Sequence, residues 1–172
     1  MKTGTQLSEK TKGNLIVPTD LKREGVAEIS ESLNLLLADV FALYLKTKSF
    51  HWHISGPHFR DYHQLLDEQA AQVFAMSDDI AERTRKIGGS TLRSISDISH
   101  HQRLRDNNDI SLSATDMLAE LCSDNKKLTG FLRLTHEVCD RNDDVATASL
   151  IENWIDETER RTWFLSAALD ES

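Results

Sequence analysis

Apolar residues recur along most of the chain at alternating steps of three and four positions, a spacing that places side chains on one face of a helix. From about residue 24 to 54 this face consists of Val26, Ile29, Leu33, Leu36, Val40 and Leu43. Gly56-Pro57 ends the predicted helix and starts a turn. A second long helix is predicted from about 58 to 87, with these residues inward: Leu66, Val73, Phe74, Ile80 and Ile87.

The second half of the chain repeats this spacing. Ser113 followed by Asp116 suits a helix start. The apolar face then runs to about residue 139 through Met117, Leu121, Leu128, Phe131, Leu132 and Val138. After an acidic turn at 140–144, a last helix is indicated by Leu150, Ile151, Trp154, Ile155, Leu165 and Leu169. The stretch from Gly89 to Leu112 is too long for a bare loop, so we expect a short helix near 94–101.

Four long helices and a short connector predict an all-α four-helix bundle. A length of 172 residues suits one domain, and only 7 Gly and 2 Pro agree with a helical protein. Residues 1–20 lack apolar periodicity, so we expect a flexible basic N-terminal tail there and the bundle over 21–172. Residues 1–23 carry a net charge of +3, which leaves −11 for the rest of a chain of net charge −8. Such an acidic body attracts cations and resists polyanions.

The compartment is indicated by what the sequence contains and lacks. No apolar run approaches the roughly 20 residues that a membrane helix needs, and no signal-peptide core follows Met1. Cys122 and Cys139 have no metal-type spacing, and we expect two buried, reduced thiols. These features favour a cytoplasmic protein, with nucleoid association if DNA is bound.

Two polar pairs with a spacing of four residues lie on the second predicted helix, His63 with Asp67 and Asp78 with Glu82. Each pair alone is as compatible with a solvated helix face as with an ion site. However, the 11 residues from Asp67 to Asp78 turn a helix to within about 20° of whole turns, so all four side chains share one stripe. The pairs are about 22 Å apart along the axis, so one helix cannot close both on one ion.

A second copy of the helix can complete each site. If two such helices pack antiparallel about a two-fold axis near Gln72 and Val73, residue i faces residue 145 − i. Position 63 then pairs with 82 and position 67 with 78, so both pairs fall into register at once. Each dimer would gain two identical sites, because an isologous interface is reciprocal.

The turn at Gly56-Pro57 supplies one more ligand candidate. It brings His51 opposite His63, while His53 would point about 200° away if the helix continues. Two imidazoles and three carboxylates suit iron, with zinc as a competitor, better than magnesium or calcium. The Glu-x-x-His motif of di-iron bundles is absent from the sequence, which argues against a metal centre inside one bundle.

Several segments of the first two helices resemble one known family. They are Lys48-Ser49-Phe50-His51-Trp52, Gly56-Pro57-His58-Phe59, His63-Gln64-Leu65-Leu66-Asp67-Glu68 and Asp78-Asp79-Ile80-Ala81-Glu82-Arg83. In these the chain resembles the Dps family (DNA-binding protein from starved cells), the small ferritin-like shells. The resemblance implies a hollow dodecamer that oxidises ferrous iron, preferably with hydrogen peroxide, at two-fold interfaces and stores ferric mineral, which protects the cell from oxidative damage.

The resemblance also implies roles for individual residues. By position, the family's iron ligands fall on His51, His63, Asp67, Asp78 and Glu82. The family places Trp52 beside the site, where it would intercept stray oxidants; packing at the helix end explains it equally well. His53 departs from the family, in which many members have Asn, and we expect it to act outside the ligand set.

Two further roles depend on the resemblance and have simpler alternatives. Asp140, Asp143 and Asp144 lie where the family has acidic three-fold pores, although acids also favour a helix N-terminus. The basic residues Lys2, Lys10, Lys12, Lys22 and Arg23 would let a shell bind DNA without sequence readout. Against DNA binding stand the acidic body and the acids Glu9 and Asp20 of the tail, and a solubilising tail is the alternative.

Other classes of function are weaker. A DNA-binding nucleoid protein with degenerate metal sites is the main alternative, but all five ligand positions are intact. An antigen or other structural shell protein is a third reading, with nothing in the sequence that favours it. The sequence has no Gly-rich phosphate loop and no GxSxG motif, so it offers nothing for nucleotide or serine chemistry.

Overall fold

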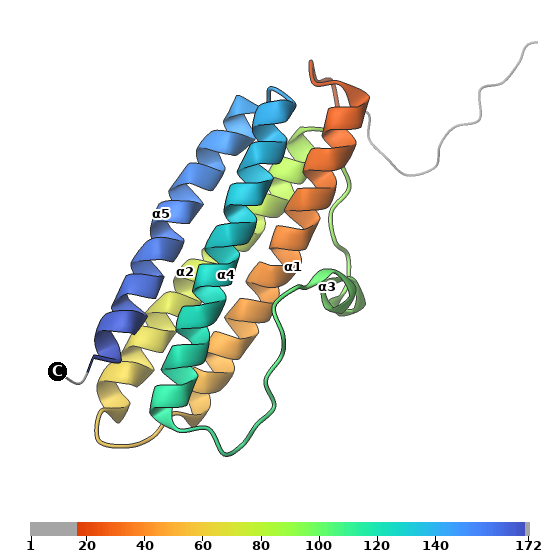
Figure 1. Ribbon diagram of the computed structural model, residues 1–172. Helices are drawn as coiled ribbons and strands as arrows, with labels where there is room; N and C mark the ends of the chain where they lie inside the picture. The colour runs from red at the N-terminus through yellow and green to blue at the C-terminus, as the bar shows by residue number, and fades with distance from the viewer. Residues whose placement is uncertain (1–16, 171–172) are drawn as a thin grey trace, which may run out of the picture.

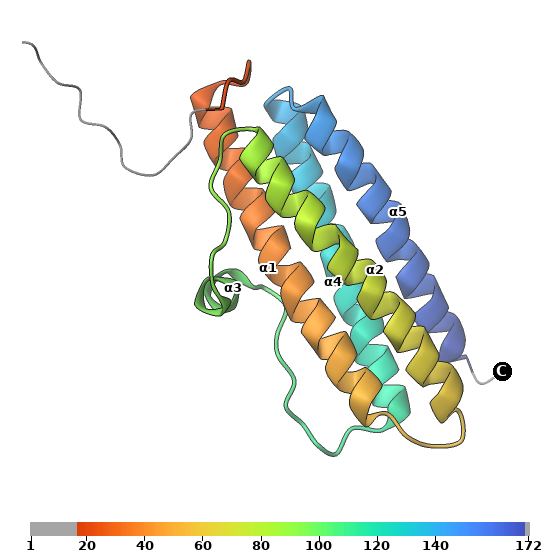
Figure 2. The same ribbon diagram turned by 180° about the vertical axis from the view of Figure 1, so that it is seen from behind.

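The computed structural model describes residues 17–170, which form five helices and no strand. The helices are α1 (Arg23–His53), α2 (Phe59–Lys86), α3 (Ile95–His101), α4 (Ala114–Arg141) and α5 (Val145–Ala168). The four long helices pack side by side as a bundle, and the short α3 lies outside it against α1 (Figures 1 and 2). The predicted all-α bundle with a connector helix is therefore confirmed, with helix bounds within about two residues of those expected.

The core consists of the apolar faces that the periodicity indicated. Ile29, Leu33, Leu36, Leu66 and Leu121 are fully buried, and α1 packs against both α2 and α4. Phe74 is a correction, because it was predicted inward and is 49% exposed. Its position seven residues after Asp67 places it on the polar stripe of α2.

Side-chain caps fix the ends of the later helices. Ser113 and Asp116 form the predicted capping box, in which Asp116 N donates to Ser113 Oγ (3.1 Å) and Ser113 N donates to Asp116 Oδ2 (3.2 Å). Asp143 adopts a left-handed φ of 59°, which lets the chain reverse between α4 and α5. Asp144 then caps α5 by accepting a hydrogen bond from Thr147 N (3.1 Å).

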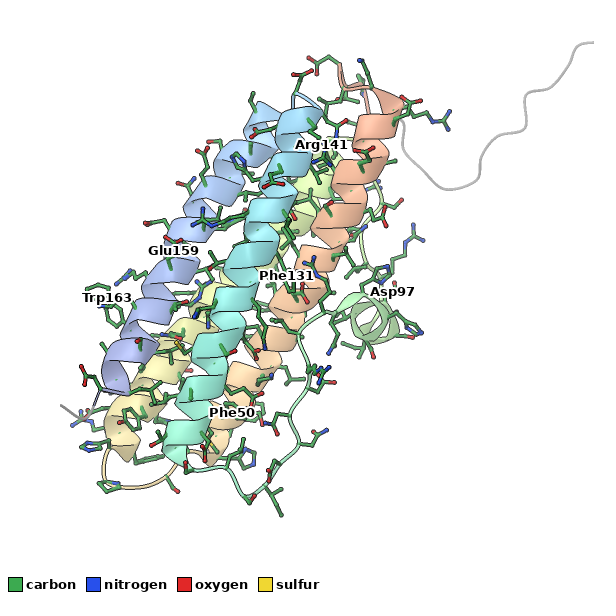
Figure 3. All side chains as sticks on the ribbon, in the orientation of Figure 1. Phe50, Asp97, Phe131, Arg141, Glu159 and Trp163 are labelled. Carbon is green, nitrogen blue, oxygen red and sulfur yellow. The ribbon has the colours of Figure 1, made fainter. Side chains whose placement is uncertain are left out.

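A buried carboxylate holds the crossover from α2 to α4 against the bundle. Asp39 of α1 is fully buried and accepts hydrogen bonds from the backbone N of Arg103 (2.6 Å) and of Leu104 (3.0 Å). The Arg103 guanidinium also pairs with Asp39 and lies 3.8 Å from the ring centroid of Phe131, labelled in Figure 3. These contacts position α3 beside α1.

The bundle core also contains a polar layer that the apolar periodicity did not indicate. Arg161 of α5 is 1% exposed and donates to Asn125 Oδ1 (3.0 Å) and to Thr158 Oγ1 (2.7 Å). Burial lowers the pKa of this guanidinium to about 10, so it remains charged at neutral pH. Lys46 forms a second buried group with Asp124 and Glu120, both at 2.7 Å.

Candidate metal centre

Two histidines meet where the end of α1 returns beside the start of α2. The His51 and His63 rings are stacked with centroids 3.7 Å apart. His51 Nδ1 is 2.8 Å from the backbone O of His63, and His63 Nδ1 is 2.9 Å from the backbone O of His51. The predicted approach of these two residues across the Gly56-Pro57 turn is therefore present in the fold.

The crossed hydrogen bonds determine which ring nitrogens are available. A carbonyl oxygen only accepts, so each Nδ1 must carry its proton and donate it. In the neutral rings both Nε2 atoms are then unprotonated, as a metal ligand requires. His51 is 8% exposed and His63 is half-buried, so the rings are held in place before any ion binds.

Asp67 brings a carboxylate to the same place. Its Oδ1 is 3.9 Å from His51 Nε2 and 2.6 Å from Lys48 Nζ. The hydrogen bond and charge of Lys48 lower the pKa of the Asp67 carboxyl below its ordinary value, with smaller contributions from His51 and His63. Asp67 is therefore an ionised, exposed carboxylate next to two imidazoles. We call His51, His63 and Asp67 the histidine half-site.

Asp78 and Glu82 lie at the other end of α2, and both are exposed. Glu82 Oε2 is paired with Lys86 Nζ at 2.9 Å, one turn further along the helix. Because α2 is one continuous helix, these residues cannot join the histidine half-site of their own chain. Within residues 17–170 no three His, Cys, Asp or Glu side chains are placed to hold one metal ion. We call Asp78 and Glu82 the acidic half-site.

The surface between the two half-sites is apolar. Phe74 lies on the same stripe and packs on Tyr44 and Phe41 of α1, with ring centroids 4.9 and 6.4 Å away. A groove of about 740 Å³ runs beside it, lined by Phe74, Asp78 and, from α3, Ile95. Ile95 is 80% exposed, so this face presents large apolar side chains to its surroundings.

Trp52 and His53 end α1 on an exposed surface. Trp52 is 59% exposed and lines a second groove with Ile95, so it does not pack within its own bundle. His53 is exposed, and its Nδ1 lies 2.7 Å from the backbone O of Ser49, away from the His51–His63 pair. That placement agrees with a role for His53 outside the ligand set.

The three acidic residues considered for a pore differ in the fold. Asp140 and Asp143 are exposed, at the end of α4 and in the following turn. Asp144 is 3% exposed, and its carboxylate is paired with Arg83 (2.7 Å) as well as capping α5. Asp144 therefore has the helix-cap role, the alternative given by the sequence.

The basic residues considered for DNA fall partly outside the described residues. Lys2, Lys10 and Lys12 lie there, as do residues 1–16 of the tail predicted over residues 1–20. Lys22 and Arg23 are described and are exposed at the start of α1. Cys122 is half-buried, which corrects the expectation of two buried thiols, and Cys139 is buried; both are free.

Lys48 and Lys86 were missed by the sequence analysis, although each pairs with a candidate ligand. Lys86 was detectable, since it follows Glu82 by four residues. Lys48 was not, because it comes from a different helix and reaches Asp67 only through the packing of α1 on α2.

Comparison with known proteins identifies the family of the chain. A family model for the ferritin-like domain matches residues 30–172. DNA protection during starvation protein 1 of Deinococcus radiodurans is 30% identical over 88% of this chain and 73% of its own length. The chain belongs to the Dps family. A low temperature-induced protein of Nostoc sp. is 34% identical over 88% of this chain and 84% of its own.

Solved Dps structures have the same fold. The X-ray structure of Dps from Thermosynechococcus elongatus matches with a TM-score of 0.84 and 26% identity, over 87% of this chain and 94% of that one. None of the helices within residues 17–170 is both long and apolar enough to span a membrane.

Proposed function

We propose that this Dps-family protein oxidises ferrous iron at sites shared between two copies of the chain and stores the ferric product inside a shell. Each site consists of His51, His63 and Asp67 from one chain with Asp78 and Glu82 of the partner subunit. The observation that carries the proposal is the crossed pair of His51 and His63, which presents two unprotonated Nε2 atoms beside an ionised carboxylate. Within residues 17–170 these side chains alone do not form a metal site, so we infer that the exposed acidic half-site of a second copy completes it in the register expected from the sequence.

The face around α2 supports association about a two-fold axis. In the register where residue i faces residue 145 − i, Phe74 meets Ala71 of the partner subunit, and the reverse contact forms by symmetry. A large ring against a small side chain is a complementary contact, and both positions are exposed in the single chain. Covering Phe74 and Ile95 would remove the apolar surface that the chain leaves open.

The chemistry follows from the ligand types. Imidazole and carboxylate ligands bind ferrous iron, and the carboxylates stabilise the more highly charged ferric product further. Two ferrous ions give one electron each to hydrogen peroxide, and two protons complete its conversion to two water molecules. Because both electrons are taken together, no hydroxyl radical is released. Zinc would bind the same ligands without reacting, as a competitor.

Assembly and uptake extend the proposal. We infer a closed shell of twelve copies, with the exposed Asp140 and Asp143 of neighbouring chains as an acidic mouth that attracts cations. Trp52 is exposed near the C-terminal end of α1 and follows His51 in the sequence. In such a shell it would intercept oxidant that escapes reaction with iron.

DNA binding is a second candidate function. Lys22 and Arg23 are exposed where the N-terminal segment joins α1, so they are available to phosphate groups along with the lysines of residues 1–16. A mobility-shift assay on protein lacking residues 1–17 tests it. Loss of retention at low salt supports DNA binding through the tail, and unchanged retention removes the tail from the account.

The test of iron oxidation compares three size-checked proteins. Ferrous iron is bound anaerobically and peroxide is added to wild type, to Asp78→Ala/Glu82→Ala, and to Asp79→Ala as a matched control for an exposed acid of α2. We expect about two irons oxidised per peroxide by wild type and by the control, from the electron balance. The double variant should oxidise iron no faster than buffer. Equal activity of all three proteins would contradict the site, and inactivity of all three would contradict the function.

A further inference from the structure

One histidine at the α4–α5 end of the bundle faces a carboxylate with each of its ring nitrogens. His136 Nδ1 lies 3.2 Å from Asp140 Oδ2, one turn further along α4. Its Nε2 lies 3.2 Å from Glu152 Oε1 of α5. The His136 side chain is 24% exposed, whereas both carboxylates are more than half exposed. The ring therefore bridges the two helices at the surface.

This bridge depends on a proton. A neutral imidazole has one N–H and an ionised carboxylate only accepts, so a neutral ring can donate to Asp140 or to Glu152 but not to both. The imidazolium donates to both. Loss of the proton therefore breaks one contact and turns a ring-nitrogen lone pair toward a carboxylate.

The neighbouring cations are already engaged. Arg133, one turn before His136, is paired with Glu159 of α5, which is labelled in Figure 3. Arg141, labelled at the end of α4, reaches the backbone O of Glu137 (3.4 Å), and Arg83 of α2 is paired with the buried Asp144.

The other charges on α4, on α5 and in the turn between them near His136 are acidic, while the start of α1 adds the exposed cations Lys22 and Arg23. Glu137 on α4, Asp143 in the turn and Asp156 on α5 are exposed, and Glu28 of α1 accepts a hydrogen bond from Asn142 (3.1 Å). The charge on His136 therefore has a large share in the local potential.

We propose that His136 is a proton-dependent clasp between α4 and α5 that sets how strongly the acidic surface around Asp140, Asp143 and Glu152 attracts cations. When the ring is protonated, it neutralises part of this surface and joins the helices. When the proton leaves, the surface becomes more negative by one charge per chain, and cations gather there. The clasp itself is independent of iron oxidation; only its consequence for iron uptake rests on the proposed function.

The size of the effect can be estimated from Coulomb's law. Removing one unit charge about 8 Å away through water changes the local concentration of a monovalent cation about twofold at low salt, and less once screening matters. The measurement covers about pH 5.5 to 8, because this is the range in which histidine side chains generally change charge.

A collisional quenching experiment reads this potential without iron. A fluorophore is attached to Val145→Cys, a position 77% exposed beside the acidic turn, in a Cys122→Ser background. The quenching constant for Cs⁺ is divided by that for neutral acrylamide, so that changes in the accessibility of the fluorophore cancel. The ratio is measured from about pH 5.5 to 8 for wild type, His136→Gln, His136→Arg and, as a control on α3, His100→Gln.

The outcomes are distinct. The wild-type ratio should rise with pH by up to about twofold, from the low value of the Arg variant to the higher value of the Gln variant. The Gln and Arg variants should change little with pH, and His100→Gln should follow wild type. A wild-type ratio that does not change with pH, or equal ratios for the Gln and Arg variants, would overturn the clasp. Iron oxidation by the same proteins is measured separately. If none of them oxidises iron, the ferroxidase proposal fails, whereas the quenching ratios still decide whether His136 acts as a clasp.

Discussion

The two ends of α2 carry the two halves of the proposed site, yet they are built differently. The histidine half-site is held by its own chain: two stacked rings, each bonded to the other's backbone carbonyl, with His51 almost fully buried. The acidic half-site consists of two exposed carboxylates, of which Glu82 forms a surface pair with Lys86. One half is preorganised by folding, and the other gains its geometry only from association.

This difference would explain how the proposed shared site remains inactive until two chains associate. Within residues 17–170 a single chain does not place three such ligands around one ion. Oxidation would then occur only where a partner closes the site, next to the interior that stores the product. The comparison predicts that changes in the histidine half-site affect both folding and chemistry, whereas changes in the acidic half-site affect chemistry alone.

The largest expected effect is on iron oxidation. His63→Ala and Asp78→Ala/Glu82→Ala should each lower the rate of peroxide-driven oxidation more than about 100-fold, since loss of even an outer partner of a metal ligand costs 10- to 100-fold. Stopped-flow absorbance of the ferric product measures it. If one half can be removed while the rate stays within a factor of a few, the two halves do not form one site.

The next effect is on association. Phe74→Asp places a charge near the proposed axis on both chains and should weaken dimer formation at least about 100-fold, with Phe74→Leu close to wild type. Light scattering gives the mass and circular dichroism the helix content. Shells of Phe74→Asp that assemble as well as wild type would place the two-fold contact on another face.

The free energy of unfolding should fall more when the histidine half-site is changed than when the acidic half-site is changed. His63→Ala removes the ring that packs on His51 and leaves the backbone O of His51 without its hydrogen bond, so it should cost about 1–3 kcal/mol in the free energy of unfolding. Asp78→Ala/Glu82→Ala removes exposed groups and should change it by less than about 0.5 kcal/mol. Thermal or urea unfolding of the two variants, compared in the same assembly state, measures these changes. Equal losses of free energy of unfolding would show that the acidic half-site is also preorganised.

The smallest effect concerns the lysines. Lys48→Met removes a cation from Asp67 and should raise the affinity for Co²⁺, used as an unreactive probe, by about threefold to tenfold at neutral pH. Lys86→Met, which removes a fully surface pair, should change it less. Calorimetric titration distinguishes the two variants, and a fall in affinity for Lys48→Met would mean that Lys48 holds Asp67 for the metal instead of competing with it.

The same variant has a pH signature. Lys48 lowers the pKa of Asp67, so this carboxylate stays ionised to lower pH than an ordinary one. The stabilising contribution of the pair is present above the ordinary aspartate pKa and is lost as the pH falls through the lowered one. In Lys48→Met the Asp67 carboxyl should therefore protonate at higher pH, which NMR of its side-chain carboxyl carbon in the metal-free protein measures, and an unchanged midpoint would contradict the role given to Lys48.

Much of the fold could be predicted because apolar periodicity reports directly on burial. The periodicity failed at Phe74, where an apolar residue belongs to a surface that another chain is proposed to cover. It also could not reveal the layer around Arg161, because a buried guanidinium looks like a surface residue until its partners Asn125 and Thr158 are placed by packing.

The candidate site was partly predictable for a similar reason. Residues four apart on one helix are neighbours by geometry, and a short turn brings His51 to His63. Contacts between separate helices, such as Lys48 with Asp67 and His136 with Glu152, depend on helix rotation and offset, which no spacing fixes. Asp144 is likewise buried as a helix cap because it pairs with Arg83 of α2, a contact between helices that the sequence spacing does not indicate.

The central claim is that each site takes one half from each of two chains, and co-assembly of two inactive variants tests it most directly. His63→Ala and Asp78→Ala/Glu82→Ala are unfolded together in equal amounts, refolded, and assayed for peroxide-driven iron oxidation. Half of the randomly formed dimers are mixed, and each mixed dimer contains one intact site, so about a quarter of the wild-type activity should return. Activity that stays at the level of either variant alone, in shells shown by mass to contain both, would contradict a site shared between subunits.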